Sequence, residues 1–148
     1  MEVNKQTGRI WAKRIVVAHD CGLVINPEAL IRVVEAGTLY GLSRALHEEV
    51  KFDAEMVTSV DWETYPILDF TERPLQIDVV LINRQNIPPN GAGEGSMRPI
   101  VAAMANAIFD ATGVRLPKSG DYTIRVYLMG AAADEGRTVP YTLSMAIM

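Results

Sequence analysis

The sequence predicts an α+β fold with short mixed β-sheets and two main helices. Apolar residues recur at three- and four-residue spacing over residues 27–47 and 96–112, the spacing of amphipathic helices. Segments rich in Ile and Val, at 10–18 and 76–82, are typical of strands. Glycine, proline and asparagine between these segments indicate turns, so each element is expected to be short.

The N-terminal segment predicts a β-hairpin followed by a capped helix. Residues 2–3 and a strand over 10–18 flank the turn signal Thr7-Gly8, and the first of the two strands is cut short. Asn26 then has the side chain preferred at a helix N-cap, and Pro27 suits the first helical position because it needs no amide partner there.

The helix over 27–47 carries two glycines, Gly37 and Gly41, four residues apart and hence on one face. Glycine inside a helix costs about 1 kcal/mol relative to alanine. Two on one face predict close packing against something large, either another backbone or a ligand. The alternative is a poorly helical segment that breaks at Gly37.

The segments after this helix predict smaller elements. A short strand over 49–52 is expected to pair with 57–61, and 69–74 is expected to be irregular. A long loop over 83–95 separates the strand at 76–82 from the helix at 96–112, which Gly113 ends.

Composition excludes several classes of protein. The chain is 49% apolar, enough for a core, and its net charge of −4 gives no electrostatic case for nucleic acid. A single cysteine, Cys21, excludes an internal disulfide and a cysteine-based zinc or iron–sulfur site. His19 and His47 lie far apart, so no metal site is predicted from this chain. No signal sequence or membrane span is evident, which makes a cytoplasmic location the default and leaves export in a complex open.

The loop over residues 90–96, Asn-Gly-Ala-Gly-Glu-Gly-Ser, is the most informative feature. Its three glycines permit positive φ angles and close approach to a ligand. It leads into a helix N-terminus at Ser96, where free N–H groups attract anions. Glu94 therefore has two interpretations: it complements the helix dipole, or it is a general base beside a phosphate-bearing cofactor. Spacing alone favours the first. Arg98 is placed to reach a phosphate or the Glu94 carboxylate.

Four blocks, taken together and in order, resemble the C-terminal part of the large subunit of the xanthine dehydrogenase and aldehyde oxidase (molybdenum hydroxylase) family. The nearest subgroup comprises bacterial isoquinoline, nicotinate and aldehyde oxidoreductases. The blocks are AHDCGLVINP at 18–27, GLSRALHEEV at 41–50, PPNGAGE at 88–94 and AMANAIFDATG at 103–113. They identify residues 1–117 as part of a C-terminal molybdenum-binding subdomain, and 118–148 as a divergent tail.

This resemblance implies a function for the 90–96 loop. Glu94 is the general base of a hydroxylation that takes its oxygen from water, and the substrate is an aldehyde or an N-heteroaromatic compound. Gly91, Ala92 and Gly93 contact a molybdenum–pterin cofactor, in a dinucleotide form. The implied partners are the rest of the molybdenum-binding large subunit, an iron–sulfur small subunit, and a flavin or cytochrome electron-transfer subunit. No nucleic acid partner is implied.

The chain also departs from the family pattern. Relatives carry glutamines where this sequence has Val33 and Tyr40, and glycine at Ala36, in a helix region that approaches the cofactor. Family large subunits are several times longer, so the chain alone is expected to hold no cofactor and to be inactive. The main alternative function is a non-catalytic remnant or interaction module that keeps only the packing. A third interpretation, a nucleotide-binding domain, depends on the glycines alone.

Overall fold

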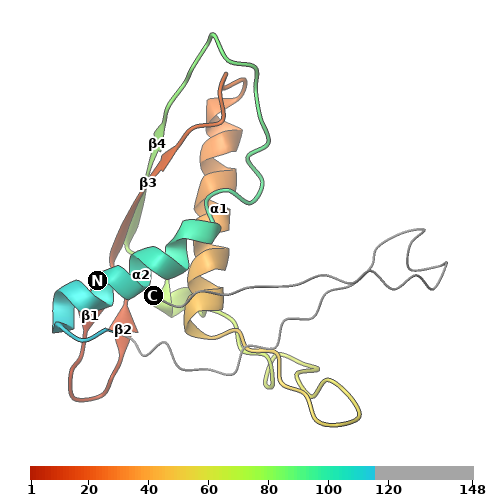
Figure 1. The fold of residues 1–148 in the computed structure, drawn as a ribbon, viewed down its shortest axis with the longest axis vertical. Helices are drawn as coiled ribbons and strands as arrows, with labels where there is room; N and C mark the ends of the chain where they lie inside the picture. The colour runs from red at the N-terminus through yellow and green to blue at the C-terminus, as the bar shows by residue number, and fades with distance from the viewer. Residues whose placement is uncertain (116–148) are drawn as a thin grey trace, which may run out of the picture. The chain divides into compact units, whose positions relative to one another are not determined.

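The structure is a computed structural model that describes residues 1–115. In these residues it confirms an α+β fold with two main helices and two short sheets, one antiparallel and one parallel (Figure 1). The predicted tail at 118–148 lies outside the described residues.

The N-terminal hairpin is confirmed, and its second strand is shorter than predicted. Strand β1 (Glu2–Val3) pairs antiparallel with β2 (Ile10–Trp11). The predicted strand at 10–18 is interrupted at Ala12 and Lys13, after which β3 (Arg14–His19) begins. Ala12 is buried in the core, and the Lys13 carbonyl accepts hydrogen bonds from the N–H groups of Leu75 and Gln76. The chain thus changes its pairing partner at this point.

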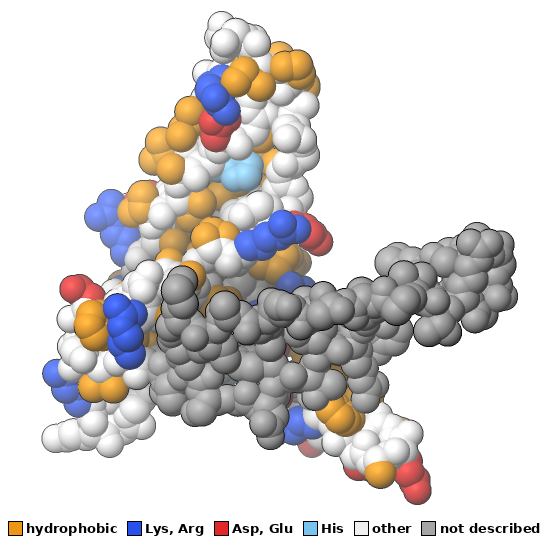
Figure 2. All heavy atoms as spheres, viewed as in Figure 1, with side chains coloured by type: hydrophobic (Ala, Val, Ile, Leu, Met, Phe, Trp, Pro, Cys, Tyr) orange, Lys and Arg blue, Asp and Glu red, His pale blue; other side chains and the backbone are white. Residues whose placement is uncertain are grey.

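Strand β3 pairs in parallel with β4 (Gln76–Leu81), in a register that runs from Arg14 opposite Gln76 to His19 opposite Leu81. Alternation places Val17 on the buried face. On the other face Val16 and Val80 are 60% and 52% exposed. Parallel sheets are normally covered on both faces, so this pair is only half covered by the described residues. Figure 2 shows the hydrophobic side chains that reach the surface beside these strands.

Helix α1 (Pro27–Leu46) begins and ends close to the predicted positions. The Asn26 side chain accepts a hydrogen bond from the Ala29 N–H at 3.0 Å, and Pro27 lies in the first turn. Val34, Thr38 and Leu42, spaced by one turn each, form the buried face, and the Thr38 hydroxyl donates to the Val34 carbonyl. An apolar stripe at this spacing is what docks a surface helix on its core.

Helix α2 (Arg98–Thr112) begins two residues later than predicted and ends at Gly113, whose φ of 73° is left-handed. Its buried residues are Ile100, Met104 and Ile108. The first two join Ala12 and Leu42 in the main apolar core. Within the described residues neither helix is long and apolar enough to cross a membrane.

The two helices meet at the glycines of α1, which confirms the predicted close packing and identifies the partner as a protein segment. A side chain at Gly41 would place its Cβ 2.6 Å from the Met97 carbonyl oxygen and 2.9 Å from Ile100 Cβ. One turn earlier, a side chain at Gly37 would collide with the Ser96 hydroxyl. The alternative of a break at Gly37 is wrong, because the helix is continuous through both glycines.

The segment from 49 to 74 differs from the prediction. The strands expected at 49–52 and 57–61 are reduced to one antiparallel bridge between Phe52 and Val57. Between the two segments, the Asp53 carboxylate accepts hydrogen bonds from the Glu55 and Met56 N–H groups and stabilises a turn. The region expected to be irregular contains a short 3₁₀ helix, η1 (Phe70–Glu72), which Asp69 caps.

We predict that Gly41→Ala lowers the free energy of unfolding by about 1–3 kcal/mol, the usual cost of forcing atoms into a packed interior. The new methyl group meets backbone, which cannot rotate away. Urea denaturation measures the change. Ala36→Gly, at an exposed position of the same helix, is the matched control and should cost only the propensity difference of about 1 kcal/mol. A stabilised Gly41→Ala protein would contradict the close approach.

Candidate functional site

The candidate site lies on the connection between β4 and α2, which runs beside the segment that follows β3. The Asn90 N–H donates to the Cys21 carbonyl at 2.8 Å, and the Leu23 N–H donates to the Ile87 carbonyl at 2.9 Å. The carboxyl ends of parallel strands share one edge of a sheet, so residues more than 60 positions apart in the chain meet there. These backbone bonds fix the start of the glycine-rich loop.

Gly22 allows this contact. Its φ is +80°, in the left-handed region, and a Cβ there would collide with the Pro88 carbonyl oxygen. The neighbouring Asp20 carboxylate accepts a hydrogen bond from the Gly22 N–H at 3.0 Å and lies 2.7 Å from the Arg84 guanidinium. The backbone N–H of Gly22, and after it the Arg84 side chain, hold the pKa of Asp20 below its ordinary value.

The three candidate cofactor-binding residues lie in an open stretch of chain. A Cβ at Gly91 or at Gly93 would meet no protein atom within 4 Å, and Ala92 is partly buried. Neither glycine has a positive φ; among the described residues only Gly8, Gly22 and Gly113 do. The freedom to adopt a positive φ is therefore not used at these two glycines. The open space around the main chain still permits a ligand to approach it.

The two residues after Glu94 are clamped between a strand end and a helix. The His19 imidazole, at the end of β3, lies 3.3 Å from where a Cβ on Gly95 would be. Ser96 is 2% exposed and packs on Gly37 of α1. Its hydroxyl and the His19 Nε2 are both buried without a hydrogen-bond partner among the described residues.

Glu94 extends from this clamped backbone into solvent. Its side chain is 74% exposed, and one carboxylate oxygen lies 3.8 Å from the Arg98 guanidinium, itself 81% exposed. Met97, not Ser96, is the N-cap of α2, and no side chain caps the helix by a hydrogen bond. An exposed ion pair at this distance contributes little to stability. The carboxylate is thus available to a ligand.

Other candidate groups do not form a competing catalytic site in the described residues. No cluster of three His, Cys, Asp or Glu side chains could hold a metal ion. His47 lies 3.0 Å from the Glu72 carboxylate. Cys21 is buried and free, as predicted. A cavity of about 570 Å³ lies beside the second half of α1, with Tyr40, Trp62 and Phe70 on its walls.

Sequence reasoning identified the loop and missed what holds it. The Asp20–Arg84 ion pair and the Ser96–Gly37 contact join residues more than 55 positions apart, and no local pattern marks such pairs. A glycine in the turn that follows a strand, as at Gly22, was the one available signal for the contact with Pro88.

Residues 1–74 match the model of the molybdopterin cofactor-binding domain family. A nicotinate dehydrogenase chain of Pseudomonas putida is 44% identical over 113 residues, which are 76% of this chain and 9% of that protein. The aldehyde oxidoreductase molybdenum-binding subunit PaoC of Escherichia coli is 28% identical over 77% of this chain and 16% of its own length. The chain therefore spans less than a fifth of these relatives.

A solved structure shares the fold. The Cu,Mo-CO dehydrogenase in its carbon monoxide reduced state superposes with a TM-score of 0.65 at 22% sequence identity. The match covers 75% of this chain and 14% of the solved chain. The arrangement of two helices and short sheets is thus one part of a much larger protein in that structure.

We predict that Asp20→Asn destabilises the chain at neutral pH and that the difference from the unsubstituted protein shrinks in acid. A carboxyl whose folded-state pKa is lowered stabilises the fold above its unfolded pKa of about 3.9 and loses this effect as the pH falls through the folded value. Denaturation midpoints measured from pH 7 to pH 3 test this. Arg84→Gln should add little to Asp20→Asn, since the ion pair is already absent. A difference that stays constant with pH would contradict the assignment.

Proposed function

Because this chain belongs to the molybdopterin cofactor-binding domain family, we propose that it supplies the catalytic loop of the molybdenum-binding subunit of a hydroxylase or dehydrogenase. The membership confirms the resemblance to the xanthine dehydrogenase and aldehyde oxidase family. The observation that carries the proposal is an exposed Glu94 carboxylate on a backbone fixed at both ends, beside an open stretch of main chain.

The described residues fit a cofactor that brings its own metal ligands. They offer no side-chain cluster for a metal ion. They do offer main chain at Gly91, Ala92 and Gly93 that is accessible to a large ligand, because a Cβ on either glycine would meet empty space. In the proposal these three residues contact a molybdenum–pterin cofactor, in a dinucleotide form. When bound, the cofactor supplies the redox chemistry, while the protein supplies position and electrostatics.

Glu94 is the general base in this proposal. A base must reach the proton that it removes, and the exposed carboxylate meets this condition, whereas a buried ion pair would not. Its backbone is positioned by the clamp on Gly95 and Ser96, and the Met97 N–H closes a turn on the Glu94 carbonyl at 3.2 Å. Arg98, the one charged partner within 4 Å among the described residues, is itself exposed and leaves the Glu94 carboxylate accessible.

The proposed substrate class is based on the names of the relatives. The names of the two relatives refer to nicotinate and to aldehydes. We propose an aldehyde or an N-heteroaromatic compound, oxidised with water as the source of oxygen. Both kinds of substrate contain an electron-poor carbon. This carbon is the centre that an oxygen derived from water would attack.

The proposed partners are the rest of the molybdenum-binding subunit, an iron–sulfur subunit, and a flavin or cytochrome subunit that accepts electrons. Both relatives are named as subunits, which supports a heteromeric assembly. The described residues contain one cysteine, so iron–sulfur clusters in such an assembly have to come from another chain or segment.

The alternative, a non-catalytic interaction module, has one specific observation in its favour. The positions at which the family carries glutamine are Val33 and Tyr40, and Tyr40 is 63% exposed on the wall of the 570 Å³ cavity. Neither side chain offers an amide to a cofactor. The open loop and the accessible Glu94 favour the catalytic proposal.

The decisive experiment is a chimera in which this chain's segment replaces the matching 113 residues of the Pseudomonas putida nicotinate dehydrogenase chain. In that enzyme we predict that Glu94→Gln lowers turnover by at least about 10², the usual contribution of a general base, with unchanged molybdenum content. Gln keeps the shape of the side chain and removes the base. Steady-state kinetics and metal analysis provide the two readouts.

Arg98→Gln is the matched control for this experiment, because it removes the same ion pair and leaves the carboxylate in place. It should retain turnover within a few-fold. Near-normal turnover of the Glu94→Gln chimera with full cofactor would show that Glu94 is not the base and would favour the interaction module.

We also predict that the 148-residue chain alone retains no stoichiometric molybdenum. The described residues lack a metal-binding cluster, and the chain corresponds to less than a fifth of its curated relatives. Metal analysis of the purified chain, expressed beside the chimera in the same host, tests this. One molybdenum per chain would overturn the expectation and would mean that the site is complete in this segment.

A further inference from the structure

Strand β3 has one open edge. The Gln76 N–H donates to the Lys13 carbonyl, and the Ile82 N–H donates to the His19 carbonyl. Hydrogen-bonding groups alternate in direction along a strand, so the odd-numbered residues of β3 direct their main-chain groups toward β4. Arg14, Val16 and Ala18 therefore direct theirs away from it. Among the described residues β4 is the only strand beside β3, which leaves a row of unpaired N–H and C=O groups.

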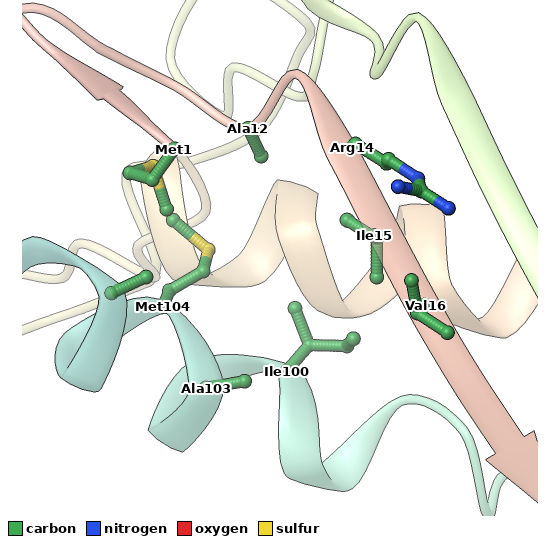
Figure 3. Close-up of a pocket in the computed structure, with 9 residues that line it drawn as sticks. Met1, Ala12, Arg14, Ile15, Val16, Ile100, Ala103 and Met104 are labelled. Carbon is green, nitrogen blue, oxygen red and sulfur yellow. The ribbon is translucent and has the colours of Figure 1, made fainter.

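This open edge borders an apolar groove. A cavity of about 200 Å³ lies between β3 and α2 and has Ile15, Val16, Ile100, Ala103 and Met104 among its lining residues. Figure 3 shows Ile100 projecting from α2 toward β3, and Met104 projecting toward Met1 at one end of the groove. The one charged side chain on the wall, Arg14, is paired with Asp78 at 2.7 Å.

The direction of β1 indicates how the groove is filled. Strand β1 runs antiparallel to β2, with Glu2 opposite Trp11, and Met1 then reaches the groove beside Ala12. In Figure 3 Met1 lies between Ala12 and Met104 at one end of the groove, so we expect a line continued from β1 back through Met1 to lead into the groove. An extended segment on this line would run antiparallel to β3 and meet its unpaired groups.

We propose that the groove receives a further β-strand of the molybdenum-binding subunit, antiparallel to β3 and in line with β1. The identity of this occupant, a strand of the molybdenum-binding subunit, rests on the proposed function. Side chains opposite Ile15 and Val17 face the helices and are apolar, while the side chain opposite Val16 faces outward. Repeating main-chain groups beside an apolar groove are the features that strand addition uses.

A second copy of this chain is a poorer occupant. If β3 of a second copy entered the groove, its apolar face would have to contact Ile100 and Met104 of the first copy. That face includes Val17, which is already buried inside the second copy. The opposite face of that strand is not a substitute, because Val16 shares it with the charged Arg14. An open edge of this kind is also a known aggregation hazard, which natural proteins usually cover.

To test this proposal, a short strand-forming segment is added to the N-terminus of the chain as a probe of the groove. An extension of about eight alternating threonine and valine residues before Met1 spans, at about 3.3 Å per residue, the six residues of β3. We expect amide hydrogen exchange at Arg14, Val16 and Ala18 to slow by at least about tenfold. Exchange at Ile15 and Val17, whose amides face β4, should change much less.

Two paired substitutions on α2 complete the design. Ala103→Glu places a charge in the groove and should abolish the added protection. Ala102→Glu makes the same change outside the groove and should leave it intact. Absence of slowed exchange in the extended chain would overturn the proposal, as would slowing that survives Ala103→Glu. So would a dimer of the unextended chain that already protects these amides, since the occupant would then be a second copy. None of these readouts depends on Glu94, so catalysis and strand addition can fail separately.

Discussion

The close contact between α1 and the segment before α2 is the constraint on which the rest of this fold depends. Gly37 and Gly41 remove the side chains from one face of α1, and Ser96, Met97 and Ile100 occupy the space. A packed interior tolerates extra atoms poorly. The position of the catalytic-loop candidate is therefore determined by two glycines, Gly37 and Gly41, that lie far before it in the chain.

A second constraint acts at the other end of the loop. The parallel pairing of β3 and β4 brings residues 19–24 beside 82–90, and backbone hydrogen bonds join the two segments. Gly22 permits their approach because it lacks a Cβ and adopts a positive φ. Between these two anchors, Gly91 to Glu94 has few protein contacts. The loop thus combines a fixed path with an exposed main chain, which suits a segment that must bind a large ligand.

The chemistry of the described residues is incomplete in an informative way. They present a carboxylate without a metal-binding cluster, which is consistent with a protein part that positions a base while a cofactor carries the redox centre. The half-covered sheet and the groove beside β3 are incomplete in the same sense, since within residues 1–115 both lack the neighbours that a parallel sheet normally has. Both features agree with a chain that spans less than a fifth of its curated relatives.

The sequence by itself determined the local elements and the family. Asn26-Pro27 marked the start of α1, Gly113 marked the end of α2, and four motif blocks identified the family, because caps, periodicity and motifs are local in the chain. Only the tertiary structure decided where the strand predicted at 10–18 breaks, since the chain leaves its pairing with β1 after Trp11 and pairs with β4 from Arg14 on. The same is true of the conformation of Gly91 and Gly93, neither of which has a positive φ, although glycine permits one. The glycine pair on α1 predicted close packing, but its partner, Ser96 to Ile100, lies too far along the chain for any local pattern to name it.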